Sequence, residues 1–284
     1  MDSMDQINSP QEEAASLELP GNHPGLGDQV YVDRRRMFFE TARAHRLAGT
    51  ATPPVAYLER EQWLWRSIYR ELNSMHESSA CRIYREGKSA LGLCDSVIPQ
   101  LPDLEQVLFR RNGVQLVPAE GLLHGKTYFQ LWADRVMPCT QFLRHDKQPQ
   151  YTPEPDIIHD VIGHVPPLAD TEYVSLIQKI GQLAKRANPD QLEELVRFYW
   201  FTIEFGLLME DGRQVILGAG ILSSTGEIEH VLSGEAAIEP FDLDRVLATP
   251  LNTTDIQERI FVAPSLAFIL EQAEALSRRW DAAR

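Results

Sequence analysis

The chain has 284 residues, of which 43% are hydrophobic and 24% charged, a balance typical of a soluble globular protein with a substantial core. Its formal net charge of −14 disfavours binding to phosphate backbones or anionic lipid, so we expect small molecules as partners, with no nucleic acid and no membrane. The three cysteines show no CxxC spacing, which argues against both a disulfide framework and a thiolate zinc site.

Residues 1–21 are rich in polar and acidic side chains, and this composition predicts a disordered tail ahead of one domain over residues 22–284. The acidic start is unlike a signal or transit peptide. No apolar stretch approaches the roughly 18 residues that a membrane span needs. We therefore expect a cytoplasmic protein.

Amphipathic spacing predicts that helices dominate this domain. The predicted helices cover residues 31–47, 60–75, 103–111, 126–135, 171–187, 191–208 and 265–280. Residues 214–224, QVILGAGILSS, are rich in β-branched residues and glycine and lie between two turn-forming dipeptides, which predicts a small sheet. The expected fold class is mainly α (α+β), with one helical domain and a small β-sheet.

The segment YTPEPDIIHDVIGHVPPL holds two histidines in a short predicted helix. Thr152 or Asp156 can cap its start, and Gly163 with the prolines after it predicts its end. His159 and His164 are five residues apart, which on a continuous α-helix places them about 140° apart around the axis. We therefore expect the helix to stop at Gly163, so that His164 can turn back toward His159. Taken alone, the pair is better explained as one core and one surface histidine, so a metal site requires a third ligand.

Glu204 lies in the apolar segment FYWFTIEFGLLME, where a lone carboxylate is costly to bury unless it is protonated, paired or bound to a metal. Pairing with Arg197 or another basic group is the alternative to metal binding. Two imidazoles and one carboxylate form the facial ligand set of non-haem Fe(II) oxygenases, and zinc hydrolases use the same ligand types. The residues alone therefore favour a metal site of His159, His164 and Glu204, and they leave oxygenation and hydrolysis open.

The motif PDIIHDVIGHVP resembles the signature of the pterin-dependent aromatic amino acid hydroxylases, the family of phenylalanine, tyrosine and tryptophan hydroxylases. Further similar motifs are NHPGLGDQVY, IPQL, CTQFLRH, YTPEPD, YWFTIEFG and GAGILSS. The resemblance implies a catalytic domain over residues 22–284 that uses Fe(II), tetrahydrobiopterin or a related tetrahydropterin, and O₂ as co-substrate. It also implies that His159, His164 and Glu204 are the catalytic iron ligands.

For the amino acid substrate, the resemblance implies a carboxylate held by Arg144, which Asp156 orients. Thr152 and Ser223 are expected nearby, and Trp200 is expected to line the aromatic pocket. A guanidinium binds a carboxylate through two hydrogen bonds, and an acid behind it holds its orientation. The alternative is that Arg144 and Asp156 form an ordinary ion pair and that Trp200 is a core residue.

For the pterin, the resemblance implies a binding segment, a stacking partner in Tyr128, and further contacts from Tyr199 and Asp160. The residues of the segment are Gly121, Leu122, Leu123 and Gly125. Some positions depart from the animal enzymes: Tyr128 replaces a phenylalanine, and Leu251 replaces a tyrosine near the iron. Asp160 and Pro138 replace a glutamate and a histidine, as in bacterial members of the family.

We expect the protein to be without the regulatory domain and the tetramerisation helix of the animal enzymes, and therefore to be a monomer. Trp200 favours a phenylalanine or tyrosine hydroxylase, whereas Thr253 replaces the aspartate expected of a tyrosine hydroxylase. The preferred prediction is a monooxygenase that converts phenylalanine to tyrosine. Hydroxylation of tryptophan, or of phenylalanine at another ring position, is the alternative within the family. A zinc-dependent hydrolase, for which the HExxH spacing is missing, and a non-catalytic binding module are the alternatives outside it.

Overall fold

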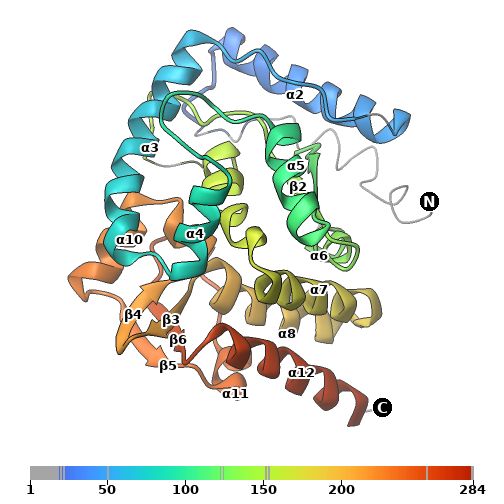
Figure 1. The fold of residues 1–284 in the computed structure, drawn as a ribbon, viewed down its shortest axis with the longest axis vertical. Helices are drawn as coiled ribbons and strands as arrows, with labels where there is room; N and C mark the ends of the chain where they lie inside the picture. The colour runs from blue at the N-terminus through green and yellow to red at the C-terminus, as the bar shows by residue number, and fades with distance from the viewer. Residues whose placement is uncertain are drawn as a thin grey trace.

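A computed structural model describes residues 19, 21, 23–49, 51–121, 123, 125–150, 152, 154–253 and 255–282. Most of these residues are helical and the strands form two small sheets, which confirms the predicted fold class (Figure 1). The predicted tail, apart from Leu19 and Gly21, lies outside the described residues, as does Leu122 of the predicted pterin segment. No helix in the described ranges is long and apolar enough to cross a membrane.

The N-terminal half is built from helices α2 (Gln29–Ala48), α3 (Glu59–Ser79), α4 (Arg82–Ala90) and α5 (Leu101–Asn112). The Asp28 side chain accepts a hydrogen bond from Tyr31 N at the start of α2, and Gly49 ends this helix in a left-handed conformation. Helix α4 was not predicted, because its nine residues include a glycine and few apolar side chains. It packs so closely that a Cβ atom on Gly87 would lie 1.9 Å from Pro166 O.

The first sheet is a parallel pair of strands, β1 (Gln115–Pro118) and β2 (Val136–Cys139), with helix α6 (Gly125–Trp132) between them in the chain. Strand β2 is buried along its whole length. The predicted helix over 126–135 was three residues too long, because the chain leaves α6 after Trp132. Arg135 then takes a positive φ of 58° directly before β2 begins.

The second sheet has the strand order β4 (Arg213–Ile216), β3 (Gly206–Glu210), β6 (Arg259–Ala263) and β5 (Ala237–Pro240). Strands β3 and β4 form an antiparallel hairpin whose two turn residues, Asp211 and Gly212, both have positive φ, as a type I′ turn requires. Strand β6 pairs in parallel with β3 and β5. The predicted sheet over 214–224 was correct only at its start, since the following residues form a short helix, α9 (Ala219–Leu222).

The remaining helices are α7 (Thr171–Arg186), α8 (Pro189–Tyr199), α10 (Thr225–Ser233), α11 (Leu243–Ala248) and α12 (Leu266–Ala282). Helix α7 packs against both α6 and α12. The predicted helix over 191–208 was wrong at its C-terminal end, where α8 is followed first by a short π-helix over residues 200–204 and then by β3.

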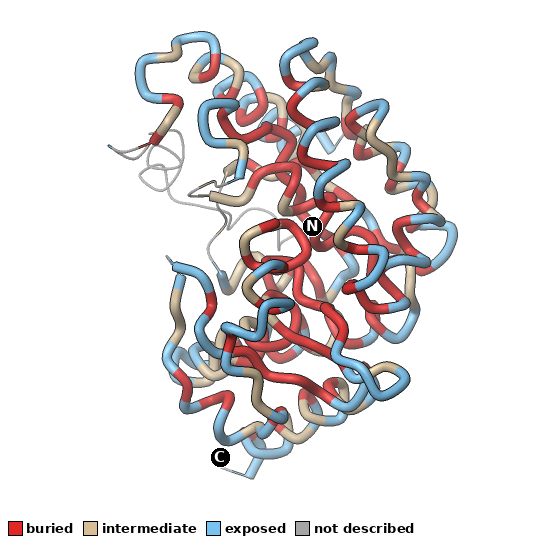
Figure 2. Tube along the Cα trace, turned by 90° about the vertical axis from the view of Figure 1, so that its left-hand side faces the viewer, coloured by how far each residue is buried: buried red, intermediate tan, exposed pale blue. Residues whose placement is uncertain are grey.

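Buried stretches concentrate in the interior of the molecule (Figure 2). The segment that carries the two histidines runs through this core. Its apolar side chains have no exposed surface: Ile157, Ile158, Val161 and Ile162. Burial of this segment holds the neighbouring polar side chains in place.

Candidate functional site

The two histidines come together on a π-helix. This helix, η1 (Ile158–His164), continues through Gly163, and Val165 N donates to Asp160 O, five residues earlier. Such a ladder places residues five apart on one face, and the Nε2 atoms of His159 and His164 lie 3.2 Å apart. The prediction that the helix stops at Gly163 was therefore wrong, although the two imidazoles do meet.

Gly163 allows close packing instead of ending the helix. A Cβ atom on Gly163 would lie 2.7 Å from Ala219 O, in helix α9. Gly220 in the same helix approaches the third candidate ligand, because a Cβ atom there would lie 3.0 Å from Glu204 Oε1. The segment GAGILSS thus packs against the helix of the two histidines and against Glu204, and its small residues make this approach possible.

Glu204 reaches the histidines from a second π-helix, η3 (Trp200–Glu204), which directly follows α8. Phe205 N donates to Trp200 O, again five residues earlier. This ladder places Tyr199 and Glu204 on one face, and the Tyr199 hydroxyl donates to Glu204 Oε2 at 2.6 Å. Both segments that carry candidate ligands therefore share one local geometry.

The Glu204 carboxylate faces both histidines. Its Oε1 lies 3.3 Å from His159 Nε2, and its Oε2 lies 3.2 Å from His164 Nε2. Burial raises the pKa of Glu204, but the two histidines outweigh burial and lower it to about 2. Arg197, the alternative partner for this carboxylate, pairs with Glu193 instead.

The spacing of these three side chains fits a metal ion. Within the described part of the chain, His159, His164 and Glu204 form the one group of three potential ligands, with donor atoms within 4.8 Å of one another. Metal–ligand bonds of about 2.1 Å at right angles place neighbouring donor atoms about 3 Å apart. The observed separations of 3.2 and 3.3 Å match one face of such a coordination sphere.

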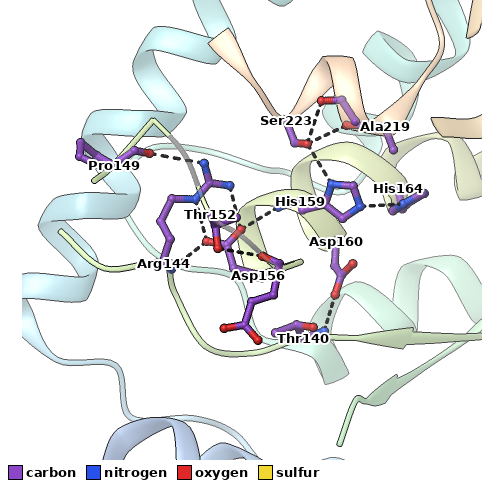
Figure 3. Close-up of polar contacts among 12 residues, drawn as sticks. Thr140, Arg144, Pro149, Thr152, Asp156, His159, Asp160, His164, Ala219 and Ser223 are labelled. Carbon is purple, nitrogen blue, oxygen red and sulfur yellow. Dashed lines mark hydrogen bonds and ion pairs between the residues drawn. The ribbon is translucent and has the colours of Figure 1, made fainter. Parts of the chain in front are cut away.

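Ser223 selects the tautomer of His159 (Figure 3). Its hydroxyl donates to Ala219 O at 2.7 Å, so the same oxygen is left to accept from His159 Nδ1 at 3.1 Å. With the proton on Nδ1, the lone pair of Nε2 points toward His164 and Glu204. A hydrogen bond of this kind orients a metal-binding histidine and raises its basicity.

Arg144 and Asp156 form a buried, two-pronged ion pair beside η1 (Figure 3). Arg144 donates from Nε and Nη2 to the two Asp156 oxygens at 2.9 and 2.8 Å. Asp156 also accepts from His159 N at 3.2 Å, so one carboxylate links the arginine to the candidate metal helix. Among the described residues, the third nitrogen, Nη1, makes one long contact, with Pro149 O at 3.4 Å.

A cavity of about 320 Å³ lies in front of the three candidate ligands. Several predicted residues line it: Gly121, Leu123, Gly125, Tyr128, Asp160, Tyr199 and Trp200. Arg144, Thr152, Asp156 and Ser223 are not part of this lining. The Thr152 hydroxyl instead donates to Glu154 O at 2.8 Å.

The polar groups of this cavity are held by neighbouring residues. Asp160 accepts from Thr140 N at 2.6 Å, and burial raises the pKa of this carboxyl group. Burial, followed by the charge of Glu204, raises the pKa of Tyr199 well above its usual range. The Trp200 indole nitrogen donates to Gln257 Oε1 at 3.0 Å, which holds the ring in one orientation.

Comparison with known proteins identifies the family. The sequence matches the biopterin-dependent aromatic amino acid hydroxylases over residues 2–281. The chain belongs to this family. It is 39% identical over 254 residues to tyrosine 3-monooxygenase of Canis lupus familiaris, and 37% identical over 252 residues to tryptophan 5-hydroxylase of Xenopus laevis. These matches cover 88% and 87% of the chain, respectively. They cover 51% and 52% of the two relatives, so the chain spans about half the length of these curated proteins.

The fold of this family member is similar to solved phenylalanine hydroxylases. The enzyme of Chromobacterium violaceum with bound iron(III) and 7,8-dihydrobiopterin has a TM-score of 0.74 and 29% identity, over 80% of this chain and 84% of that one. The cold-active enzyme of Colwellia psychrerythraea 34H has a TM-score of 0.74 and 28% identity, over 81% and 91%. The relatives are named for three different amino acids, so they establish the hydroxylase family and its biopterin dependence without choosing the substrate.

Several residues of this hydroxylase cavity were missed by sequence reasoning, among them Phe129, Thr140 and Phe142. Phe129 follows Tyr128 and packs its ring 4.9 Å from that of Tyr199. Thr140 contributes a backbone N–H group, which no side-chain pattern reveals. Thr140 and Phe142 both lie in the motif CTQFLRH, so the resemblance carried a signal for this segment.

Two of the departures from the animal hydroxylases lie away from this lining. Leu251 is partly buried and packs against the hydrophobic core, and Thr253 is exposed. Neither residue is among those that line the cavity. The other three departures, Tyr128, Asp160 and Pro138, do line it.

Proposed function

We propose that this chain is an iron- and tetrahydropterin-dependent monooxygenase that hydroxylates the ring of a free aromatic amino acid, with phenylalanine as substrate and tyrosine as product. One observation carries the proposal. In a member of the biopterin-dependent family, the donor atoms of His159, His164 and Glu204 converge on the lining of a 320 Å³ cavity. Two imidazoles and a carboxylate on one side of Fe(II) leave positions open for O₂ and substrate.

The chain supplies an oriented ligand set for this chemistry. Ser223 keeps His159 in the tautomer that can bind a metal, and Tyr199 donates to the ionised Glu204. When bound, iron and the tetrahydropterin supply the oxidising chemistry that places one atom of O₂ on the ring. The protein side of the reaction is then to hold the ligands, exclude water and present the ring.

We assign the substrate carboxylate to Arg144. Asp156 holds the guanidinium through two hydrogen bonds and also accepts from His159 N, so the anchor and the metal ligand keep a constant separation. Thr152 lies in the loop that precedes Asp156. Trp200, whose indole is held by Gln257, offers a flat wall for the aromatic ring.

We assign the pterin to the part of the cavity lined by Gly121, Leu123 and Gly125, a segment to which Leu122 also belongs. Glycine lets a flat heterocycle approach the backbone closely. Tyr128 is the proposed stacking partner, since an aromatic ring stacks on a pterin with or without a hydroxyl. Asp160 and Tyr199 are the polar residues of the lining that we assign to the pterin.

Phenylalanine is the proposed substrate because the predicted substrate wall is aromatic and apolar. Burying the hydroxyl group of tyrosine without a partner costs about 1–3 kcal/mol. Thr253, where a tyrosine hydroxylase has an aspartate, is exposed and carries no charge. Tryptophan, or another ring position of phenylalanine, is the alternative within the family.

The test is to supply iron-loaded protein with a tetrahydropterin and O₂, add phenylalanine, tyrosine or tryptophan separately, and identify the product isomers. We expect tyrosine from phenylalanine, with slower turnover of the other two. Faster hydroxylation of another amino acid would correct the substrate alone. No hydroxylated product from any of the three would overturn the proposed function, and hydrolysis that depends on zinc would replace it.

A further inference from the structure

A buried polar network outside the cavity connects helices α3 and α4 to the candidate metal site. His76 on α3 and Lys88 on α4 are 2% and 7% exposed, and Tyr84 is fully buried. Lys88 Nζ lies 3.1 Å from His76 Nδ1, and the Tyr84 hydroxyl lies 3.2 Å from the same nitrogen. Burying polar side chains costs free energy even when they are paired. We therefore expect these three buried groups to position other parts of the molecule.

Lys88 determines which nitrogen of His76 carries the proton. An ammonium group can only donate, so His76 Nδ1 accepts from Lys88 and Nε2 is protonated. Nε2 then donates to Leu222 O at 2.7 Å. Burial, followed by the charge of Lys88, lowers the pKa of His76 to about 3, which keeps the ring neutral. Lys88 is itself held over the ring of Tyr69, with Nζ 4.6 Å from the ring centroid.

The carbonyl that His76 holds is one residue from the site. Leu222 is the last residue of α9, and the next residue, Ser223, accepts from His159 Nδ1 (Figure 3). Helix α9 has four residues, too few to be stable alone, so its position depends on its contacts with the rest of the fold. His76 provides such a contact at the C-terminal end, from the core-facing side of α3.

We propose that His76, oriented by Lys88, is a positioning residue for the metal centre: it anchors the peptide between Leu222 and Ser223 and thereby orients His159. This inference rests on the proposed function, because it requires the three candidate ligands to bind a metal. Removing a residue that orients a metal ligand directly lowers metal affinity about 10- to 100-fold. His76 acts through one further hydrogen bond, so its loss should lower affinity about tenfold, the lower end of that range.

The test uses Co(II) as a probe, because its absorption spectrum reports ligand geometry without turnover. Three variants separate the roles: His76→Gln, which keeps an N–H group for Leu222 O; His76→Leu, which removes it; and His76→Leu with Lys88→Met, which also removes the buried charge. Leu72→Ala, a core truncation one helical turn earlier on α3, is the control for general destabilisation. For each protein we would measure the Co(II) Kd, the Co(II) spectrum and the melting temperature without metal.

We expect His76→Gln to bind Co(II) within about twofold of the parent, whereas both His76→Leu proteins lose about tenfold and show an altered spectrum. The double variant should recover part of the melting temperature, since it also removes the buried charge that His76→Leu leaves without its partner, and should not recover the affinity. Unchanged Co(II) affinity in the double variant, or an equal loss in Leu72→Ala, would overturn the positioning role alone. A parent protein that binds no metal would overturn the proposed function and this inference with it.

Discussion

Glu227 provides a test of the structure that does not depend on catalysis. This carboxylic acid lies on α10, is 7% exposed, and accepts from Gln257 N at 3.1 Å. Burial raises its pKa from 4.5 to about 7, although the Gln257 N–H group and the charge of His230 act in the opposite direction. The same glutamine holds Trp200, so the acid supports one wall of the cavity.

A carboxyl group whose pKa is higher in the folded state than in the unfolded state stabilises the fold at acidic pH, since the folded state then binds more protons. For Glu227 this stability is fully present below pH 4.5 and is lost as the pH rises through about 7. A pKa difference of about 2.5, at about 1.4 kcal/mol for each pH unit, corresponds to roughly 3 kcal/mol.

The variant Glu227→Gln keeps the shape and one acceptor oxygen but cannot ionise. In urea unfolding at pH 5 and pH 8, the free energy of unfolding of the variant relative to the parent should increase by about 2–3 kcal/mol between the two pH values. Glu229→Gln, an exposed position on the same helix, is the control and should show no such change. A difference between Glu227→Gln and the parent that stays constant with pH would refute the reasoning.

Three further outcomes follow from the site. Arg144→Lys keeps the charge but loses the planar fork, so steady-state kinetics should show the KM for the amino acid rising about 10-fold or more while the KM for the pterin stays constant. Gly163→Ala places a Cβ atom 2.7 Å from Ala219 O. Thermal unfolding should therefore show that the free energy of unfolding falls by about 1–3 kcal/mol, and Co(II) titration should show a higher Kd. Gln257→Leu leaves the partly buried Trp200 N–H group without its acceptor, so kcat/KM should fall about fivefold or more. In a Trp200→Phe background, a double-mutant cycle should show little further loss.

The long helices could be predicted because each presents one apolar face to the core. Helices α2, α3, α5, α7 and α12 repeat this pattern over three or more turns. Helix α4 and strand β2 are short, and they form through contacts with segments distant in sequence, such as Gly87 against Pro166. Amphipathic spacing carries no information about such contacts.

The chemistry of the site could be predicted better than its geometry. A glutamate in an apolar segment, together with two histidines elsewhere in the chain, favours a metal site whatever the local backbone, and the structure places these side chains together. The change from an α-helical to a π-helical ladder at Ile158 cannot be predicted from amphipathic spacing, so Gly163 was misread as a helix end. Gln257 is 57 residues from Trp200 in sequence, and His76 is 146 residues from Leu222. These contacts could therefore be found only in the structure.

The most direct test of the central claim is to remove metal with a chelator, restore the protein with Fe(II) or Zn(II), and measure hydroxylated phenylalanine in the presence of a tetrahydropterin. The account predicts product with about one equivalent of Fe(II), none with Zn(II), and none in Glu204→Gln or His159→Ala, which should also fail to bind iron. Hydroxylation by either variant at the parent rate, or activity restored by Zn(II), would contradict a catalytic iron held by His159, His164 and Glu204.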